Sequence, residues 1–217
     1  MQRIYRLAEL TEDWNYIAQH DGWSSAMPAI LGKLSSLLYQ RRQFIVMARS
    51  LSTPLPDLLP KIDLEIRPFE PADLALIQGY DLPSDAKLCA RRLMFGHRGL
   101  LALSHGQFTG YAWSYTAAQP ALDRLRFELA PGDVLLISDY TVPAFRRRGV
   151  QTALILARLR LFHSLGYQCA YTCIAMQNNP SLAAYRKAGV REYGVMYDLR
   201  IGPWRRTHFR RFETMNC

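Results

Sequence analysis

The sequence predicts an α/β (α+β) fold in which helices flank a mixed central sheet, preceded by a small N-terminal helix and strand extension. Strand-like and helix-like runs alternate from residue 63 onwards, and glycine or proline stands at most of their junctions. Apolar residues make up 49% of the 217 residues, which is enough for one sizeable core and a small appendage. The sequence contains no internal repeat, which argues against a repeat architecture.

The first 60 residues read differently from the rest. They combine a predicted amphipathic helix at residues 25–41, a short strand-like run at 44–48 and a linker at 52–60 that contains three prolines. We therefore expect residues 1–60 to be an extension, with a domain boundary near residue 61. Residues 202–217 are expected to form a basic, loosely packed C-terminal tail.

Six elements are predicted in the first half of the domain. In order they are a strand, two helices and three strands, at residues 64–67, 73–80, 84–95, 99–104, 107–116 and 134–137. Between the fourth and fifth elements, His105 and Gly106 have the composition of a hairpin turn.

The second half is predicted to begin with the longest helix, at residues 147–165. This helix is apolar on nearly every side, so we expect it to be largely buried, and Gly166 supplies its stop. The remaining elements are a strand, a helix opened by Asn179 as N-cap and two final strands, at residues 168–174, 179–189, 190–193 and 195–201.

A net charge of +9 is concentrated in two stretches. Residues 146–160 carry five arginines and no acid, and residues 200–217 carry five arginines against one glutamate. Such charge suits nucleic acid, an anionic membrane or an acidic or phosphorylated ligand. Because it is local, each stretch needs its own explanation.

The remaining bulk features favour a cytoplasmic protein without a membrane span or metal. No run of 18 apolar residues occurs, and the start lacks a hydrophobic signal core. The four cysteines and the histidines lack metal-ligand spacing. Cys169 and Cys173 would lie about 13 Å apart on one strand, too far for a disulfide, so reduced thiols are expected.

The segment at residues 139–154 carries the clearest chemical signal, because it leads from a strand through a tight turn into the buried helix. A helix start exposes unpaired N–H groups and a positive dipole end, which together bind phosphate. Gly149 allows a close backbone approach, and Arg147 and Arg148 can add charge-assisted contacts. Taken alone, the three arginines could equally form a solvated basic corner.

A second segment makes the signal specific. "PAFRRRGVQTAL" is followed about 30 residues later by "NNPSLAAYRKAGV", and together they resemble the two signature motifs of the GNAT acyltransferase superfamily. Arg146 and Gly149 match the first motif, whereas Gln151 stands where glycine or alanine is usual and could tighten the phosphate loop. The likeness covers residues 63–201 and implies a GNAT-like acyltransferase domain at residues 61–201.

The resemblance also implies roles for particular residues. The strand end would meet the pantetheine arm of the donor, the helix start its pyrophosphate, and Asn178 would contact it too. The implied cofactor-binding residues are Tyr140, Thr141, Arg147, Arg148, Gly149, Val150, Gln151, Thr152 and Asn178. Tyr185 occupies the place of the general acid that protonates the departing thiolate; without the family match it reads as a core tyrosine.

The resemblance supplies no general base, since Cys173 stands where many relatives have a glutamate. Asp139 is a candidate by position, with strand-end capping as the alternative role. A chain of solvent molecules, or an acceptor that arrives already deprotonated, would need no residue at all.

The resemblance implies an N-acetyltransferase that moves an acetyl group from acetyl-CoA to a primary amine of a small molecule in a ternary complex. The N-terminal extension resembles leaders of polysaccharide-associated members, which suggests an amino sugar and a role in shaping the acceptor side or in forming a homodimer. One alternative is a longer acyl chain from acyl-CoA or an acidic acyl carrier protein, which the basic surface would suit. Another is a non-catalytic GNAT-shaped module; nucleic acid is the less favoured partner.

Overall fold

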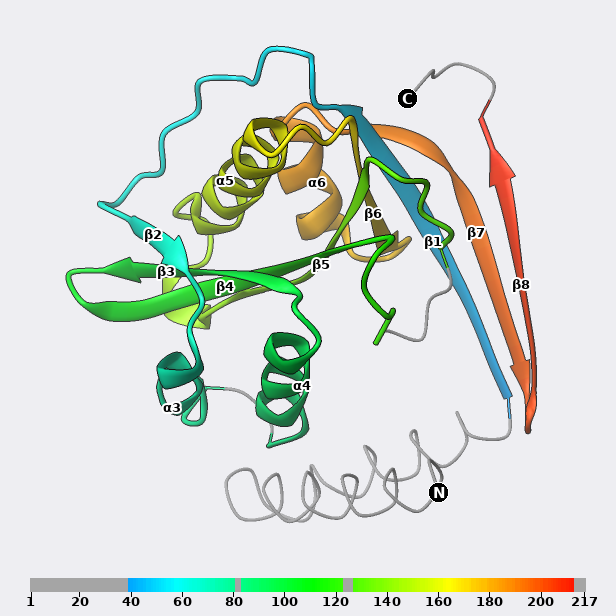
Figure 1. Cartoon of the computed structure of the whole chain (residues 1–217), viewed down its shortest axis with the longest axis horizontal. Helices are drawn as coiled ribbons and strands as arrows, with labels where there is room; N and C mark the ends of the chain where they lie inside the picture. The colour runs from blue at the N-terminus through cyan, green and yellow to red at the C-terminus, as the bar shows by residue number, and fades with distance from the viewer. Residues whose placement is uncertain (1–38, 81–82, 123–126, 213–217) are drawn as a thin grey trace.

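A computed structural model describes residues 39–80, 83–122 and 127–212 of the chain. These residues form one eight-stranded sheet in the order β2-β3-β4-β5-β6-β1-β7-β8 (Figure 1). The strands are β1 Tyr39–Ser50, β2 Glu65–Pro68, β3 Arg98–Ser104, β4 Gln107–Thr116, β5 Asp133–Thr141, β6 Cys169–Ala175, β7 Arg191–Ile201 and β8 Trp204–Arg211. The helices are η1 Pro71–Asp73, α3 Leu74–Ile77, α4 Pro83–Met94, η2 Pro143–Phe145, α5 Val150–Ser164 and α6 Asn179–Lys187. The mixed α/β fold expected from the sequence is thus confirmed.

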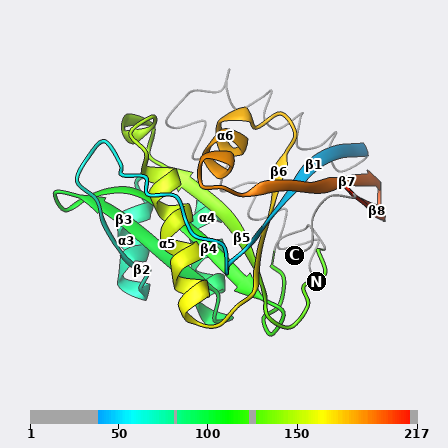
Figure 2. The same cartoon turned by 90° about the horizontal axis from the view of Figure 1, so that it is seen from above.

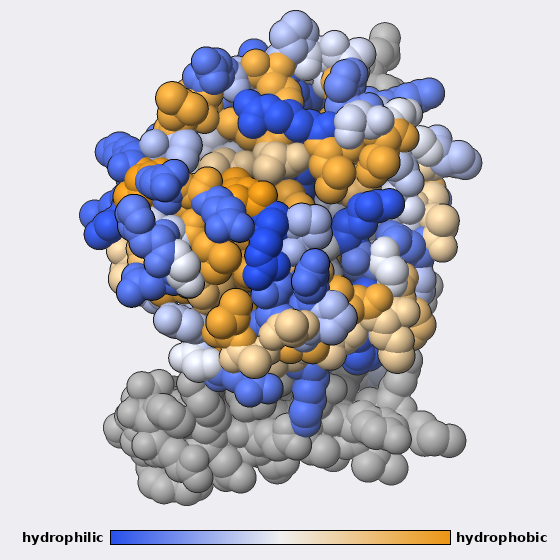
Figure 3. Space-filling model, turned by 60° about the vertical axis from the view of Figure 1, so that its left-hand side comes forward, coloured by the Kyte–Doolittle hydropathy of each residue, from blue (hydrophilic) through white to orange (hydrophobic). Residues whose placement is uncertain are grey.

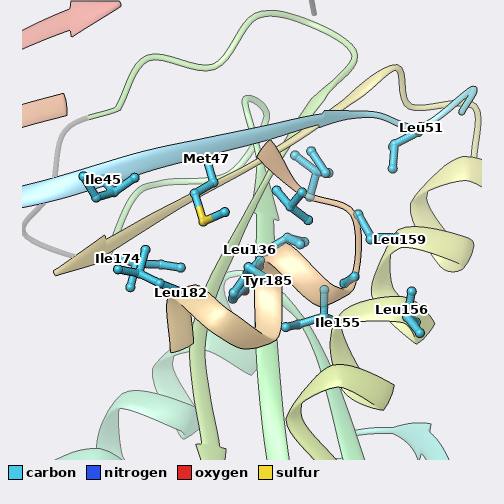
Figure 4. Packing of buried hydrophobic residues seen from close by; sticks show 14 of the residues in the cluster. Ile45, Met47, Leu51, Leu136, Ile155, Leu156, Leu159, Ile174, Leu182 and Tyr185 are labelled. Atoms are coloured by element: carbon cyan, nitrogen blue, oxygen red, sulfur yellow. The ribbon is translucent and has the colours of Figure 1, made fainter. Parts of the chain in front are cut away.

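Helices cover both faces of the sheet (Figures 1 and 2). On one face α5 and α6 enclose the largest buried cluster, in which Leu136 of β5 meets Ile155 and Leu182 of the two helices (Figure 4). On the other face α3 and α4 cover β3 and β4 through Ile77 and Cys89. Because β5 is buried on both sides, its run of apolar residues shows no alternation, as the sequence already indicated.

The strand expected at residues 44–48 does not belong to a separate extension. It is part of β1, which lies inside the sheet and pairs antiparallel with both β6 and β7. Residues 44–49 are buried, as a central strand requires. The proposed boundary near residue 61 therefore does not separate two folding units, because the proline-rich segment only carries the chain from β1 to β2 (Figure 1). The helix expected at 25–41 lies outside the described residues, except that residues 39–41 belong to β1.

The C-terminal end also differs from expectation. The two strands expected at 190–193 and 195–201 are one strand, β7, and Gly194 between them makes no turn. A Cβ added at Gly194 would lie 2.6 Å from the Phe209 ring, so glycine allows close contact with β8. Half of the tail expected at 202–217 is the edge strand β8, antiparallel to β7.

The remaining elements follow the prediction within a few residues. The His105-Gly106 turn is a hairpin in which both residues have positive φ, 49° and 75°, as a two-residue hairpin loop requires. The N-cap of α6 is Asn178 rather than Asn179. Cys169 is disulfide-bonded, so the expectation of reduced thiols is wrong at that position. In the part of the chain that the structure describes, no helix has the length and apolar character needed to span a membrane.

Candidate active site

The two parallel strands at the centre of the sheet separate towards their carboxyl ends. β5 and β6 pair with each other as far as Leu136 and Thr172. β5 then continues to Thr141 and β6 to Ala175 without pairing with each other. Ser138 has a positive φ of 48°, and the register with β4 shifts at the same level, as in a β-bulge. We call the opening between the two strands beyond Leu136 and Thr172 the strand fork.

A buried polar network lies at the strand fork, on the face covered by α5 and α6. Arg158 of α5 donates from Nη2 to Asp139 Oδ1 at 2.5 Å and to the Tyr185 hydroxyl at 3.2 Å. Its Nη1 donates to the carbonyl of Trp113 at 2.8 Å. The side chains of Arg158 and Asp139 are 1% and 7% exposed, so this ion pair is almost fully shielded from water.

Burial controls the protonation of this network. Burial raises the pKa of Tyr185 above its usual value, and the neighbouring Asp139 carboxylate raises it further, while Arg158 opposes the shift. The hydroxyl therefore keeps its proton at neutral pH. Desolvation of the buried Arg158 lowers its pKa, but Asp139 and Tyr185 together outweigh that effect and raise it, so the guanidinium stays charged.

Gln151 connects the network to α6. Its Nε2 donates to Asp139 Oδ2 at 3.3 Å and to Ser181 Oγ at 3.1 Å. Asn178 caps α6, because its Oδ1 accepts the N–H of Ser181 at 3.3 Å. The starts of α5 and α6 are thus joined across the strand fork by side-chain hydrogen bonds.

The turn before α5 presents positive charge at a helix start. Arg146, Arg147 and Arg148 are exposed, and the N-cap Gly149 supplies no side-chain acceptor for the first N–H groups. Figure 3, which brings the left-hand side of Figure 1 forward, shows hydrophilic side chains among apolar patches on that face. A helix start of this kind attracts anions through its dipole and its free donors.

The comparison with known families decides how the site is to be read. Residues 64–190 match the model of the acetyltransferase (GNAT) family, which is more than half of the chain. The chain belongs to the GNAT acetyltransferase family. The acetyltransferases of this family use acetyl-CoA as the acyl donor.

Solved structures support the GNAT fold. A Drosophila protein has a TM-score of 0.56 and 18% identity, with 78% of this chain and 55% of that one covered. A GCN5-related N-acetyltransferase from Sphaerobacter thermophilus has a TM-score of 0.54 and 18% identity, with 85% and 58% covered. The chain thus spans little more than half the length of these proteins. No curated protein matches the sequence.

The structure brings together some of the expected GNAT site residues and separates others. Asp139, Gln151 and Tyr185 meet at the strand fork, where the Gln151 side chain is directed to Asp139. Tyr140 points to the opposite face, where its ring lies 5.4 Å from that of Tyr111 and its hydroxyl donates to the carbonyl of Tyr80. Only the backbone of Tyr140 could therefore border a donor at the fork.

Gly149 has a different neighbour from the one expected. Its φ is 89°, and an added Cβ would lie 3.1 Å from Pro60 Cα. The N–H of Lys61 also donates to the carbonyl of Arg148 at 2.8 Å. Because Gly149 has no side chain, the segment before β2 can pack closely against it. A role for position 149 in phosphate binding would therefore depend on its backbone alone.

Arg158 is the site residue that sequence reasoning missed, because it was counted with the basic stretch at residues 146–160. It follows Leu154 by four positions and so shares the buried face of α5. An arginine on the apolar face of a helix needs a buried acceptor, which is a signal that the sequence did contain. No group of three His, Cys, Asp or Glu side chains suited to a metal ion occurs among residues 39–80, 83–122 and 127–212.

Proposed function

We propose that this protein transfers an acetyl group from acetyl-CoA to a primary amine of a small molecule, by direct attack in a ternary complex. The observation that carries the proposal is the position of the buried Tyr185 hydroxyl at a strand fork, next to the uncapped, arginine-flanked start of α5, in a GNAT chain. The donor needs two binding features at one end of the sheet: the start of α5 for its diphosphate and the strand fork with Tyr185 for its thioester.

The start of α5 suits the donor's diphosphate. The N–H groups of Val150, Gln151 and Thr152 lie in the first helical turn, where no preceding helical carbonyl can accept them. Arg147 and Arg148 are exposed on the adjoining turn and can add charge. The backbone of residues 139–141 leads from this turn to the fork and would border the pantetheine arm.

The chemistry at the fork begins with attack by a neutral amine on the thioester carbonyl. The carbonyl oxygen gains negative charge, and then the carbon–sulfur bond breaks and a thiolate leaves. Tyr185 can give its proton to that thiolate. Because Arg158 only donates to the Tyr185 oxygen, the phenol proton must point to another acceptor. The acceptors within reach are the side chains of Thr172 and Asp139, and the leaving sulfur once the donor is bound.

No side chain at the fork is a good general base. Burial raises the pKa of Cys173 to about 12, so its thiol stays protonated at neutral pH. Asp139 accepts from both Arg158 and Gln151, and we assign it the role of positioning Arg158 rather than removing a proton. The acceptor would then arrive as the free amine. Its nitrogen would lose a proton to solvent after the attack, and the Tyr185 oxygen would be reprotonated from solvent once the thiolate has taken its proton.

A thiol-release assay tests the proposal. The protein is mixed with acetyl-CoA and with single primary amines, amino sugars among them, and free thiol is followed over time. We expect release that depends on the amine. Absence of coenzyme A binding at millimolar concentration would refute the proposal.

The same assay examines the acyl donor. Acetyl-CoA is compared with longer acyl-CoA thioesters and with acyl carrier protein at equal concentration. The basic surface of β8 would suit the acidic carrier, which keeps this alternative worth measuring. Reaction with the carrier-bound chain alone would show that the donor assignment is wrong.

A further inference from the structure

A groove of about 770 Å³ lies on the sheet face opposite α5 and α6. It is bordered by β6, β7 and β8 and by residues 127–130, which lead into β5 and cross β6 and β1 (Figure 1). Phe127 and Leu129 of that segment pack on a buried cluster that includes residues of β1, β6 and β7. The sheet thus forms the floor of the groove, and the segment forms one of its walls.

Four aromatic rings line the groove and touch one another in a closed circuit. The ring centroids of Phe127 and Tyr171 lie 5.1 Å apart, and those of Tyr171 and Tyr193 lie 5.5 Å apart. Phe209 completes the circuit at 5.9 Å from Tyr193 and 5.8 Å from Phe127. Ring faces carry partial negative charge, so such a circuit attracts a cation.

Two carboxylates, Glu128 and Asp133, share the groove with these rings. Asp133 accepts the N–H of Ala130 at 3.1 Å, and none of the described basic side chains pairs with either carboxylate. Burial accordingly raises the pKa of Asp133 above its usual value. The one arginine in the lining of the groove, Arg205, is bonded to Asp198 and to neither of these carboxylates.

The two arginines on this side are already engaged. Arg205 donates to Asp198 at 2.6 Å, and Arg211 lies over the Tyr193 ring with its guanidinium carbon 4.7 Å from the centroid. The second contact places a cation on one face of Tyr193, so that face is already occupied, and a ligand would have to use the other rings of the circuit.

We propose that this groove binds an alkylammonium group, with the rings around its carbons and Asp133 or Glu128 beside its charge. The ligand class follows from the pairing of π faces with carboxylates that lack a counter-ion. A neutral aromatic ligand would use the rings but would leave both carboxylates without a partner.

The groove also lies close to the strand fork. Tyr171 immediately precedes Thr172, where the pairing of β5 with β6 ends, and Cys173 beyond it belongs to the same face as Tyr171. Asp133 precedes Leu136 by three residues, which is about 10 Å along an extended strand. An acceptor with two nitrogens roughly that far apart could place one beside Asp133 and present the other at the fork. This step rests on the proposed function and names linear diamines and polyamines as the acceptor class.

Binding is measured first, by calorimetry on the whole protein without coenzyme A. The probes are diaminobutane, diaminooctane and spermidine, with butylamine as the singly charged reference. We expect diaminooctane and spermidine to bind, and Asp133→Asn and Phe209→Leu each to weaken binding about tenfold. Asp63→Asn removes an equal charge from an exposed position away from the groove, and its affinity should equal that of the unaltered protein. Equal affinity in all four proteins, or no binding at millimolar probe, overturns the proposal.

Turnover separates this inference from the proposed function. With acetyl-CoA, Asp133→Asn should raise KM for diaminooctane about tenfold and leave KM for butylamine unchanged. If diamines bind the groove while coenzyme A does not bind, the proposed function fails and the ammonium site stands. If butylamine is acetylated as well as diaminooctane and Asp133→Asn changes neither KM, the groove is not part of the acceptor site.

Discussion

Arg158 and Tyr185 are 27 positions apart in the sequence, yet the guanidinium of the first lies 3.2 Å from the hydroxyl of the second. Both side chains are 1% exposed, and Asp139 completes the group. Buried polar contacts of Arg158 therefore join α5 to α6 and to the end of β5. A change in any of these three elements should disturb the proposed site.

Removal of Arg158 should destabilise the fold more than removal of the whole ion pair. Arg158→Met leaves the Asp139 carboxylate buried without its cation, which typically costs about 3–5 kcal/mol. The double variant Arg158→Met, Asp139→Leu should recover part of that loss, because no unpaired charge remains. Urea denaturation of both variants measures the difference, and equal stability of the two would show that the pair is not shielded as described.

Tyr185→Phe tests the proton donor. We expect turnover to fall about ten- to a thousand-fold while coenzyme A affinity stays nearly unchanged, the range for loss of one general acid. Tyr167→Phe is the matched control, because Tyr167 packs on the same cluster away from the fork. Single-turnover thiol release measures both variants, and unchanged turnover would remove Tyr185 from the mechanism.

A negative charge at the start of α5 should block donor binding without unfolding the helix. In Thr152→Glu the new carboxylate lies in the first turn, where the dipole stabilises it but where it would repel a diphosphate. Arg160→Glu on the exposed side of the same helix provides a charge control. Calorimetry should show coenzyme A affinity lost about a hundredfold only in Thr152→Glu; comparable affinities in both would place the diphosphate elsewhere.

The value of kcat/KM should rise with pH and should not decline near neutral pH. Since the pKa of Tyr185 is raised, the phenol remains a donor beyond the pH at which an ordinary tyrosine ionises, about 10. The acceptor amine meanwhile becomes more reactive as it loses its proton. Measured kcat/KM should therefore increase up to about pH 9.5, and a descending limb near pH 8 would mean that another group donates the proton.

Gly110→Ala should disturb the fork from β4, the strand that pairs with β5. An added Cβ at Gly110 would overlap the carbonyl oxygen of Tyr140 and approach Thr141 Cα to 3.3 Å, so β5 must move. Gly79→Ala, where no atom lies within 4 Å, is the control. Thermal unfolding and donor affinity should both fall only in Gly110→Ala, by an amount typical of overpacking, about 1–3 kcal/mol; a neutral result would indicate that β5 yields freely at its bulge.

Local sequence patterns predicted most of the helices, strands and turns of this protein. The apolar helix at α5, the hairpin at His105-Gly106 and the strand-turn-helix start at Gly149 depend on neighbouring residues, which period and turn chemistry record. The two motifs indicated the family and made Tyr185 a candidate general acid, and the strand end before them made Asp139 a candidate base, before any geometry was known.

Only the tertiary structure decided how distant segments combine. The position of β1 between β6 and β7, the pairing of β8 and the contact of Pro60 with Gly149 all join residues far apart in the chain. The same holds for Arg158, whose charge resembled surface charge in the sequence. Burial and pairing of this kind depend on which strands become neighbours, and no local periodicity carries that information.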